Sequence, residues 1–250
     1  MDSSRHNCPV CSNPTFLFDV VDFSKSCEEK NGKFLKLSGE PIYYYCCEVC
    51  NFLFAKEMYL WSPEKFKTKI YNKDYIDVDP DYLKLRPQNN ANIISEMFKN
   101  QKVDIKHLDY GGGNGLLSKK LKEDGFDSKS YDPFTDLNIN INNIGKFNLI
   151  TAFEVFEHVA DVKKLMNNLK LLLEDQGLIL FSTLISDNKI IKNQSLTWWY
   201  VAPRNGHISI FSRKSLSTLS RNFELNFGSF DNGFHILCKK VPSWASHLIK

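Results

Sequence analysis

The stretch HLDYGGGNGLLSKKL, residues 107–121, decides the fold of this chain. A strand ends in Asp109, glycines follow at alternate positions, and a helix begins directly afterwards. Glycines allow a sharp turn and bring backbone N–H groups close to a ligand at the start of a helix. A nicotinamide-type G-x-G-x-x-G turn requires glycine at position 116, where this chain has leucine. The pattern is D-x-G-x-G-x-G, and it predicts a strand, a ligand-binding turn and a helix in succession.

From residue 103 onwards, predicted strands alternate with predicted helices. Strands are expected at 104–110, 128–134, 146–153 and 177–184, and helices at 115–124, 161–175 and 212–223, the last of them capped by Ser212. Two further strands at 223–230 and 233–241 are joined by Asp-Asn-Gly, which predicts a closing hairpin. This alternation predicts an α/β fold with a doubly wound, mainly parallel sheet and an antiparallel edge.

Composition indicates an ordinary globular protein. The 250 residues are 42% hydrophobic and 24% charged, with a formal net charge of +3, so a packed core is expected. Lysine and arginine are scattered among nearly as many acids, which favours neither a nucleic acid nor a membrane surface as partner. No segment approaches the roughly 18 apolar residues of a membrane span. The N-terminus lacks the apolar core of a secretion signal, and we expect a cytosolic protein.

The cysteines predict a metal site near the N-terminus. Six of the seven lie within the first 50 residues, and in a reducing compartment such clustering favours a metal over disulfides. CPVC and CEVC have the spacing of a structural four-thiolate Zn²⁺ site, with the ligands Cys8, Cys11, Cys47 and Cys50. The alternatives are metal-free cysteines or Cys46 in place of Cys47, and Cys27 and Cys238 are interpreted as ordinary thiols.

We expect three regions: a zinc-binding, ribbon-like head at 1–56, a helical linker or cap at 57–102, and the α/β core at 103–250. Strands at 16–24 and 41–45, with turns near Gly32 and Gly39, give the head too little core to fold without a metal. In the linker, Ser62 and Pro63 are typical of a helix start, and 87–100 is a second predicted helix.

The predicted core carries an acid, Asp132, at the end of its second strand, 21 residues after Gly111. A carboxylate at this position can accept hydrogen bonds from both hydroxyls of a ribose. With D-x-G-x-G-x-G and the final hairpin, the chain over roughly residues 60 to 241 resembles the class I S-adenosylmethionine-dependent methyltransferases. A doubly wound domain that binds another nucleotide, or none, is the alternative.

The resemblance implies a Rossmann-like sheet of seven strands. It also implies that S-adenosyl-L-methionine is the cofactor, with its methionine part at the glycine turn and its ribose at Asp132. Residues 151–153 would line the opposite side. The implied cofactor-binding residues are Asp109, Gly111, Gly112, Gly113, Gly115, Asp132, Pro133 and Phe153.

A second polar cluster follows the strand at 146–153, in LITAFEVFEHVADV (149–162). If 154–158 form one helical turn, Glu154, Glu157 and His158 share a face. Carboxylate and imidazole ligands there suit Mg²⁺, Mn²⁺ or a similar cation; the alternative is that they only orient the next helix. This E-x-x-E-H resembles that of the ubiquinone-pathway and small-RNA 2′-O-methyltransferases, in which it holds a divalent ion. A later histidine, His207, is predicted to be a further ligand or a general base, or else only to pack.

The loop that carries His207 reads TWWYVAPRNGHISIFS (197–212). Trp198, Trp199 and Tyr200 are interpreted as an aromatic lid over the substrate or as simple buried rings. Arg204 is interpreted as a partner for an anionic substrate group or as a solvated side chain.

We therefore expect a methyltransferase that acts on an oxygen of a small metabolite, or of a sugar in polysaccharide or glycan biosynthesis, with the Glu/His cluster activating the hydroxyl. An RNA methyltransferase that uses the zinc head for RNA recognition, a sugar C-methyltransferase and a non-enzymatic scaffold are the alternatives. The weak charge disfavours RNA. The acceptor and the oligomeric state are not predicted.

Overall fold

The computed structural model describes residues 6–249 and divides the chain into two compact units. The first unit comprises Met1–Pro80, Phe156–Lys163 and Thr183–Leu219, and the second comprises Asp81–Val155, Lys164–Ser182 and Ser220–Lys250. Two segments from the second half of the chain thus belong with the N-terminal residues, which is not the linear division expected from the sequence. Residues 1–5 of the expected head and residue 250 of the expected core lie outside the described residues.

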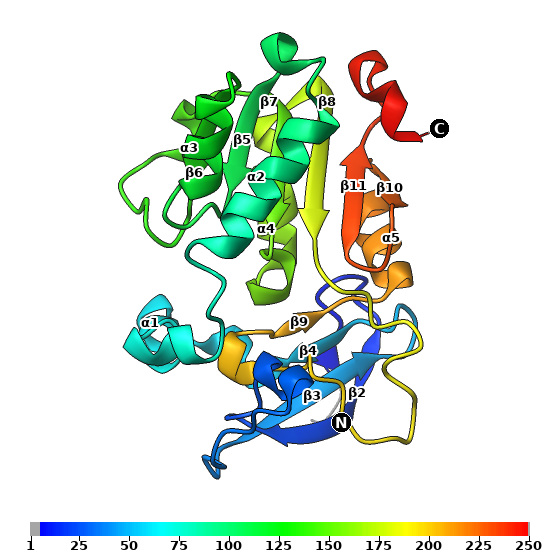
Figure 1. The fold of residues 1–250 in the computed structure, drawn as a ribbon. Coiled ribbons are helices and arrows are strands. Elements are labelled where there is room, and N and C mark those ends of the chain that lie inside the picture. Colours follow the sequence, from blue (N-terminus) through cyan, green and yellow to red (C-terminus); the bar gives the residue numbers. More distant parts are fainter. Residues whose placement is uncertain (1–5, 250) are drawn as a thin grey trace. The chain divides into compact units, whose positions relative to one another are not determined.

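The first unit is built on a five-stranded antiparallel sheet in the order β1-β2-β3-β4-β9. Its strands are β1 (His6–Asn7), β2 (Pro14–Asp22), β3 (Pro41–Cys47), β4 (Leu53–Ala55) and β9 (Ser209–Ile210). β9 is far away in sequence, yet Leu53 pairs with Ile210 and Phe54 with Ser209, so β9 lies beside β4 (Figure 1). This pairing attaches the loop that carries His207 to the N-terminal sheet.

Local signals of the first unit are confirmed where the sequence was specific. Helix α1 (Pro63–Lys69) begins as expected, because the Ser62 hydroxyl accepts a hydrogen bond from the N–H of Lys65 at 3.2 Å. Gly32 and Gly39 both have φ of 75°, a left-handed conformation that favours glycine at a turn. Buried aromatic rings fill the sheet's interior face, with the rings of Phe52 and Phe211 4.9 Å apart.

The second unit is an α/β domain around a six-stranded sheet in the order β10-β11-β8-β7-β5-β6. Its strands are β5 (Lys106–Tyr110), β6 (Asp127–Tyr131), β7 (Phe147–Phe153), β8 (Leu173–Ser182), β10 (Asn226–Ser229) and β11 (Phe234–Cys238). The four central strands are parallel, whereas β11 runs antiparallel to β8 and β10 antiparallel to β11. The mainly parallel sheet and its closing hairpin are confirmed.

The expected count of seven strands is wrong for the described residues, in which this sheet has six. The segment between β8 and α5 (Arg213–Asn222) supplies no strand to it, because its strand β9 pairs with β4 in the first unit. In the hairpin, Oδ1 of Asp231 accepts hydrogen bonds from the N–H groups of Gly233 and Phe234, both at 2.7 Å, which fixes the turn.

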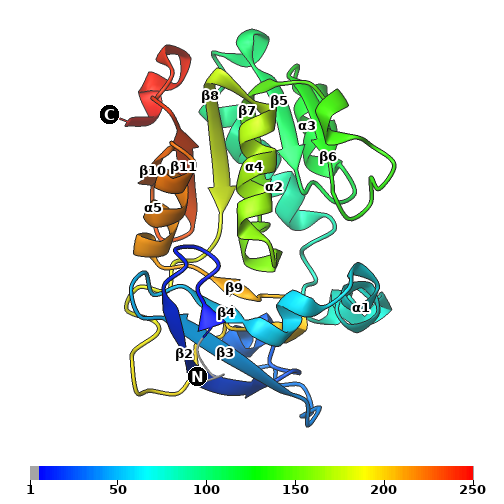
Figure 2. The ribbon, with the colours of Figure 1, turned by 180° about the vertical axis from the view of Figure 1, so that it is seen from behind.

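Helices cover both faces of the second sheet. α2 (Leu85–Met97) and α3 (Leu116–Glu123) lie on one face, and α4 (Val162–Leu172) lies on the other (Figures 1 and 2). α5 (Arg213–Asn222) spans the boundary between the two units, and the Ser212 hydroxyl caps it by accepting from the N–H of Ser215 at 3.0 Å. The main core cluster includes Ile94, Phe98, Leu117, Leu121, Leu149, Leu178, Leu180 and Ile236. Among residues 6–249, every helix falls short of the length and apolar character that crossing a membrane requires.

Candidate active site

The glycine turn follows β5 at the carboxyl edge of the parallel strands. Gly111, Gly113 and Gly115 have φ values of 76°, 54° and 72°, which favour glycine over residues with a side chain. Gly112 is required for space instead. A Cβ there would lie 2.3 Å from Oγ of Ser130 and 2.5 Å from Oδ2 of Asp109. The turn therefore passes directly over the Asp109 carboxylate before α3 begins.

Asp132, directly after β6, faces the same turn. Its Oδ2 accepts a hydrogen bond from the N–H of Gly113 at 2.9 Å, and its Oδ1 accepts from the N–H of Phe134 at 2.7 Å. Pro133 is exposed beside it, and Phe153 is half-buried at the end of β7. Because parallel strands end at one edge of the sheet, the residues predicted to bind a cofactor are gathered there.

Burial dominates the electrostatics of Asp109. Its side chain is 4% exposed, and Oδ1 accepts a hydrogen bond from the hydroxyl of Thr151 at 2.8 Å. Loss of solvent raises the pKa of Asp109 to about 7, the Thr151 hydrogen bond opposes this, and the charge of Asp132 adds to it. Near neutral pH, Asp109 is thus balanced between its charged and neutral forms.

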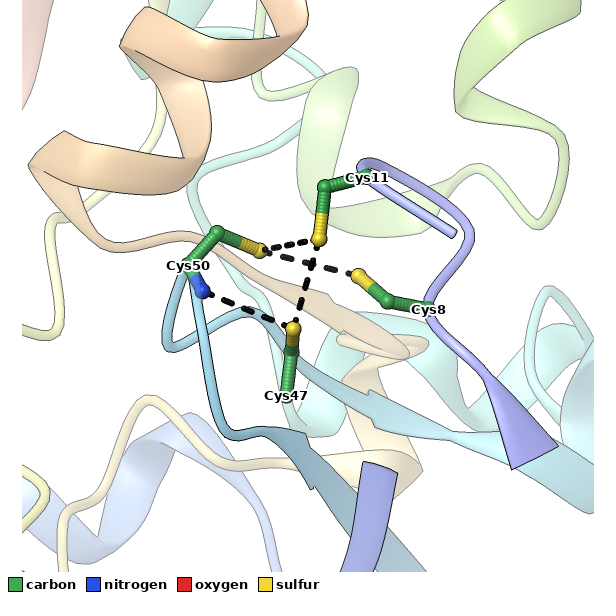
Figure 3. Close-up of side chains that lie close together, drawn as sticks. All are labelled: Cys8, Cys11, Cys47 and Cys50. Carbon is green, nitrogen blue, oxygen red and sulfur yellow. Dashed lines mark hydrogen bonds between the residues drawn. The ribbon is translucent and has the colours of Figure 1, made fainter. Parts of the chain in front are cut away.

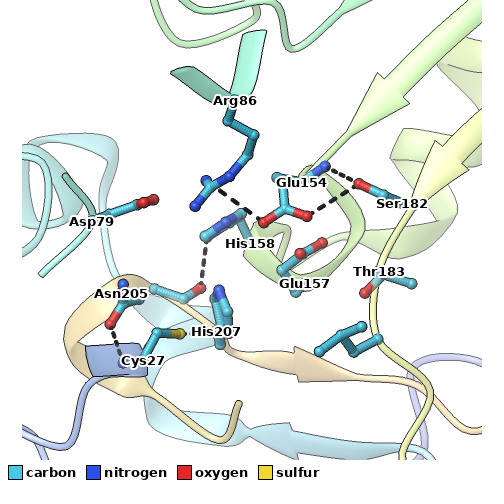
Figure 4. A network of polar contacts seen from close by, with 12 residues as sticks. Cys27, Asp79, Arg86, Glu154, Glu157, His158, Ser182, Thr183, Asn205 and His207 are labelled. Atoms are coloured by element: carbon cyan, nitrogen blue, oxygen red, sulfur yellow. Dashed lines mark hydrogen bonds and ion pairs between the residues drawn. The ribbon is translucent and has the colours of Figure 1, made fainter. Parts of the chain in front are cut away.

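Glu154 does not share a helical turn with Glu157 and His158, and that prediction is wrong. Its φ is 55°, and the short 3₁₀ turn begins only at Phe156. The N–H of Glu154 donates to Oγ of Ser182 at 2.9 Å, and that hydroxyl donates back to Oε1 at 3.1 Å. Arg86 Nη1 lies 3.6 Å from Oε2 (Figure 4). Sequence reasoning missed Arg86, since a single arginine near the start of α2 carries no motif.

Three of the four residues predicted to bind a divalent ion do converge in the first unit. One ligand atom from each of Glu157, His158 and His207 lies within 4.8 Å of the others, as Figure 4 shows. Backbone pairing holds the two segments together, because the N–H of Ile208 donates to the carbonyl of Glu157 at 2.9 Å. The group therefore depends on the pairing of β9 with the N-terminal sheet.

The surroundings of this Glu/His group set its hydrogen bonding. Glu157 is fully buried, and its Oε1 accepts a hydrogen bond from the hydroxyl of Tyr200 at 2.5 Å. Nδ1 of His207 lies 2.8 Å from the carbonyl of Tyr200, and Nδ1 of His158 lies 3.2 Å from that of Gly206. Nδ1 of His158 also lies 3.3 Å from the Tyr71 hydroxyl. Because carbonyl oxygens only accept, the closer Tyr200 contact places the proton of His207 on Nδ1 and its lone pair on Nε2. Histidines that bind metals through Nε2 have this arrangement.

The aromatic loop is packed rather than open at its centre. Tyr200 is buried, with its ring 4.3 Å from that of His207, so the alternative of simple burial holds for it, and Trp198 and Trp199 are half-buried. Arg204 is also buried and donates to the carbonyl of Ile70 at 3.1 Å. Its guanidinium anchors the loop to the end of α1 instead of being solvated.

The four cysteines predicted to bind zinc form the second group among the described residues that could hold a metal ion (Figure 3). The Sγ atoms are 3.6 Å apart for Cys8 and Cys50, 3.4 Å for Cys11 and Cys47, and 3.5 Å for Cys11 and Cys50. Four thiolates around Zn²⁺ at 2.3 Å are about 3.8 Å apart, so the donor set fits a tetrahedral ion. Cys46 is outside the group, and burial raises the pKa of its thiol to about 12.

Comparison with known proteins identifies the family of this chain. Residues 82–227, more than half of the chain, match the family of methyltransferase domains. The chain belongs to the methyltransferase domain family. The prediction of a methyltransferase is thereby confirmed.

Curated relatives of this methyltransferase domain carry one name. A ubiquinone biosynthesis O-methyltransferase of Rickettsia bellii (strain OSU 85-389) is 28% identical over 145 residues, 46% of this chain and 60% of that protein. A namesake from Colwellia psychrerythraea is 31% identical over 121 residues, 39% of this chain and 48% of that protein. The matched part thus spans about half the length of these relatives.

A solved O-methyltransferase family protein from Burkholderia thailandensis shares the fold. The TM-score is 0.52 at 12% identity, and the alignment covers 75% of this chain and 67% of that one. At this identity the likeness supports the architecture of the methyltransferase domain alone.

Proposed function

We propose that this methyltransferase transfers the methyl group of S-adenosyl-L-methionine to a hydroxyl oxygen of a small acceptor. The observation that carries the proposal is the sheet edge of the second unit, where the glycine turn crosses Asp109 and donates to Asp132. The names of the curated relatives support oxygen as the acceptor atom. The near-balanced charge of the chain supports a small acceptor over RNA.

In this proposal Asp132 accepts hydrogen bonds from the ribose hydroxyls, and the turn at Gly111 to Gly115 borders the methionine part. Asp109 supports the turn from below, and Phe153 and Pro133 provide apolar surface at its sides. The cofactor already carries an activated methyl group, so the protein's task is to place the acceptor in line with it. Such positioning supplies on the order of 7–11 kcal/mol.

We further propose that Glu157, His158 and His207 hold a divalent metal ion. The donor set fits one: a buried carboxylate and two imidazoles, each with its Nδ1 atom near a backbone carbonyl. A bound cation would lower the pKa of the acceptor hydroxyl, which is otherwise a poor nucleophile at pH 7. With Glu154 bonded to Ser182 instead, two imidazoles outnumber one carboxylate, which favours a transition metal such as Zn²⁺ or Fe²⁺ over Mg²⁺.

In the absence of a bound ion, the Nε2 lone pair of His207 would instead make this residue the candidate base for the acceptor's proton.

The four-cysteine group is proposed to hold a structural Zn²⁺ in the first unit. A tetrahedral four-thiolate site leaves no open coordination position, so the ion would stabilise the fold and not take part in transfer. The sheet β1-β2-β3-β4-β9, whose β9 follows His207, would be the part that it stabilises.

The proposal is tested by incubating the chain with S-adenosyl-L-methionine labelled in its methyl group. Acceptors are a catechol, a hexose, a nucleotide sugar and a short RNA, with Zn²⁺, Fe²⁺, Mn²⁺ or Mg²⁺ added singly. We expect labelled methyl ethers on a small hydroxyl compound. Label on RNA, label on a sugar carbon, or cofactor binding without transfer to any hydroxyl would each contradict the proposed oxygen-directed activity.

A further inference from the structure

A chain of buried polar side chains runs through the core of the second unit, under the glycine turn. Its links are Ser118 Oγ to Ser128 Oγ at 3.0 Å, Ser128 Oγ to His107 Nδ1 at 2.7 Å, and His107 Nε2 to Thr151 Oγ1 at 3.0 Å. The last link joins Thr151 to Oδ1 of Asp109 at 2.8 Å. All five side chains are buried. Buried polar groups are costly unless paired, and here each one is paired to the next.

At the Asp109 end of this hydrogen-bonded series, the donor and acceptor of each bond can be assigned. The Thr151 hydroxyl has one proton and donates it to Asp109, so toward His107 its oxygen must accept. Nε2 of His107 therefore carries the proton of a neutral imidazole, and Nδ1 lies 2.7 Å from the Ser128 hydroxyl. Burial lowers the pKa of His107 to about 3, so the ring is neutral near pH 7.

The glycine turn packs against Asp109, the last member of this hydrogen-bonded series of side chains. A Cβ on Gly112 would lie 2.5 Å from Oδ2 of Asp109, so the backbone of the turn lies directly against that carboxylate. Oδ1 of the same carboxylate is held by Thr151. Rotation of Asp109 would therefore displace the backbone N–H groups of the turn.

We propose that His107 is a positioning residue for the cofactor edge: its Nε2–H orients the Thr151 hydroxyl, which holds Asp109 under the turn at Gly112. This inference rests on the proposed function, because it takes Asp109 and the turn to border the methyl donor. His107 itself contacts neither, and it acts through Thr151.

The same sheet offers a matched control. His235 on β11 is, like His107, fully buried, and its Nδ1 lies 2.8 Å from the Ser229 hydroxyl. β8 and β7 separate β11 from β5 in the strand order. Replacing either histidine by phenylalanine removes one buried imidazole from the same sheet, but only one of the two is bonded to Thr151.

The experiment is calorimetric titration of S-adenosylhomocysteine into the full chain and its variants, with thermal unfolding of each. We expect His107→Phe to weaken binding about 3- to 10-fold, the usual effect of one hydrogen bond. His235→Phe should bind as wild type, and His107→Gln, which keeps a donor and an acceptor, should recover part of the loss. Equal affinity of His107→Phe and wild type, or equal losses in both phenylalanine variants, would overturn the inference.

Thr151→Val keeps the experiment decisive if His107→Phe does not fold. Without the hydroxyl, the pKa of Asp109, measured from its carboxyl carbon resonance, should rise, and affinity should fall about 3- to 10-fold. An unchanged pKa and an unchanged affinity together refute the coupling. Wild-type protein that binds no cofactor refutes the proposed function instead, and the carboxyl resonance still reports whether Thr151 and His107 control Asp109.

Discussion

The hydroxyl of Tyr200 donates a 2.5 Å hydrogen bond to the buried carboxylate of Glu157, 43 residues away in the sequence. The carbonyl of the same tyrosine lies 2.8 Å from Nδ1 of His207. One residue of the aromatic loop thus orients two of the three members of the Glu/His group. This gives Tyr200 a positioning role in the proposed metal site.

Tyr200→Phe should therefore lower the rate of methyl transfer about 10- to 100-fold, the usual effect of removing a partner of a metal ligand. Cofactor affinity should stay within about twofold of wild type. Tyr59→Phe is the control, because the Tyr59 hydroxyl is bonded to Ser209 in the same unit and not to the group. A Tyr200→Phe variant with the wild-type rate would remove the positioning role.

His207→Ala should abolish transfer and leave cofactor binding nearly intact, because the cofactor edge is built from other residues. Chelation should have the same effect, and a single added divalent ion should reverse it. His6→Ala, at the edge of the same unit, is the control. Transfer that survives both treatments would show that the group is only structural.

Gly112→Ala should lose most cofactor affinity, at least about tenfold. The new methyl group would meet the Ser130 hydroxyl at 2.3 Å and the Asp109 carboxylate at 2.5 Å, which forces the turn to shift. Gly228→Ala is the matched control, since its Cβ would meet Ile236 at 2.8 Å in the distant hairpin. Calorimetry compares the two, and equal affinities would contradict the placement of the cofactor.

Cys47→Ser should lower bound zinc below one ion per chain and lower the midpoint of thermal unfolding by roughly 10 °C or more. Cys46→Ser is the control, because Cys46 is the adjacent buried cysteine outside the four-sulfur group. Metal analysis and calorimetry of both variants test the proposal. Full zinc content in Cys47→Ser would exclude this residue as a ligand.

The stability of the chain should depend on pH through Asp109. Its pKa is raised from 3.8 to about 7, first by burial, so between pH 4 and 7 the folded state binds more protons than the unfolded state. The contribution of this residue to the free energy of unfolding is fully present below pH 4. It falls by roughly 4 kcal/mol as the pH rises to 7. Denaturant unfolding of Asp109→Asn should lack this decline, and identical pH profiles would contradict the raised pKa.

The second unit was largely predictable from the sequence because its signals are local. The strand before Gly111 and the Asp-Asn-Gly turn after Phe230 are each specified within a few positions, as are the capping residues Ser62 and Ser212 of the first unit. The cofactor edge follows from them, because parallel strands end together.

The first unit was not predictable in the same way. β9 is a two-residue strand, too short for a periodic signal, so nothing local shows that the loop before it returns to the N-terminal sheet. In the second unit, the left-handed Glu154 likewise has no signature, because glutamate rarely adopts positive φ. The hydrogen bond between Tyr200 and Glu157 joins residues 43 positions apart, so no local pattern predicts it.

The most direct test is calorimetric titration of S-adenosyl-L-methionine into the intact chain and into Asp132→Asn. We expect saturable one-to-one binding to wild type and a loss of about tenfold or more in Asp132→Asn, because an amide cannot replace both charge-assisted acceptor bonds. No heat of binding to the folded wild-type chain, or equal affinities for both proteins, would contradict the central claim that the methyl donor lies across the glycine turn with its ribose at Asp132.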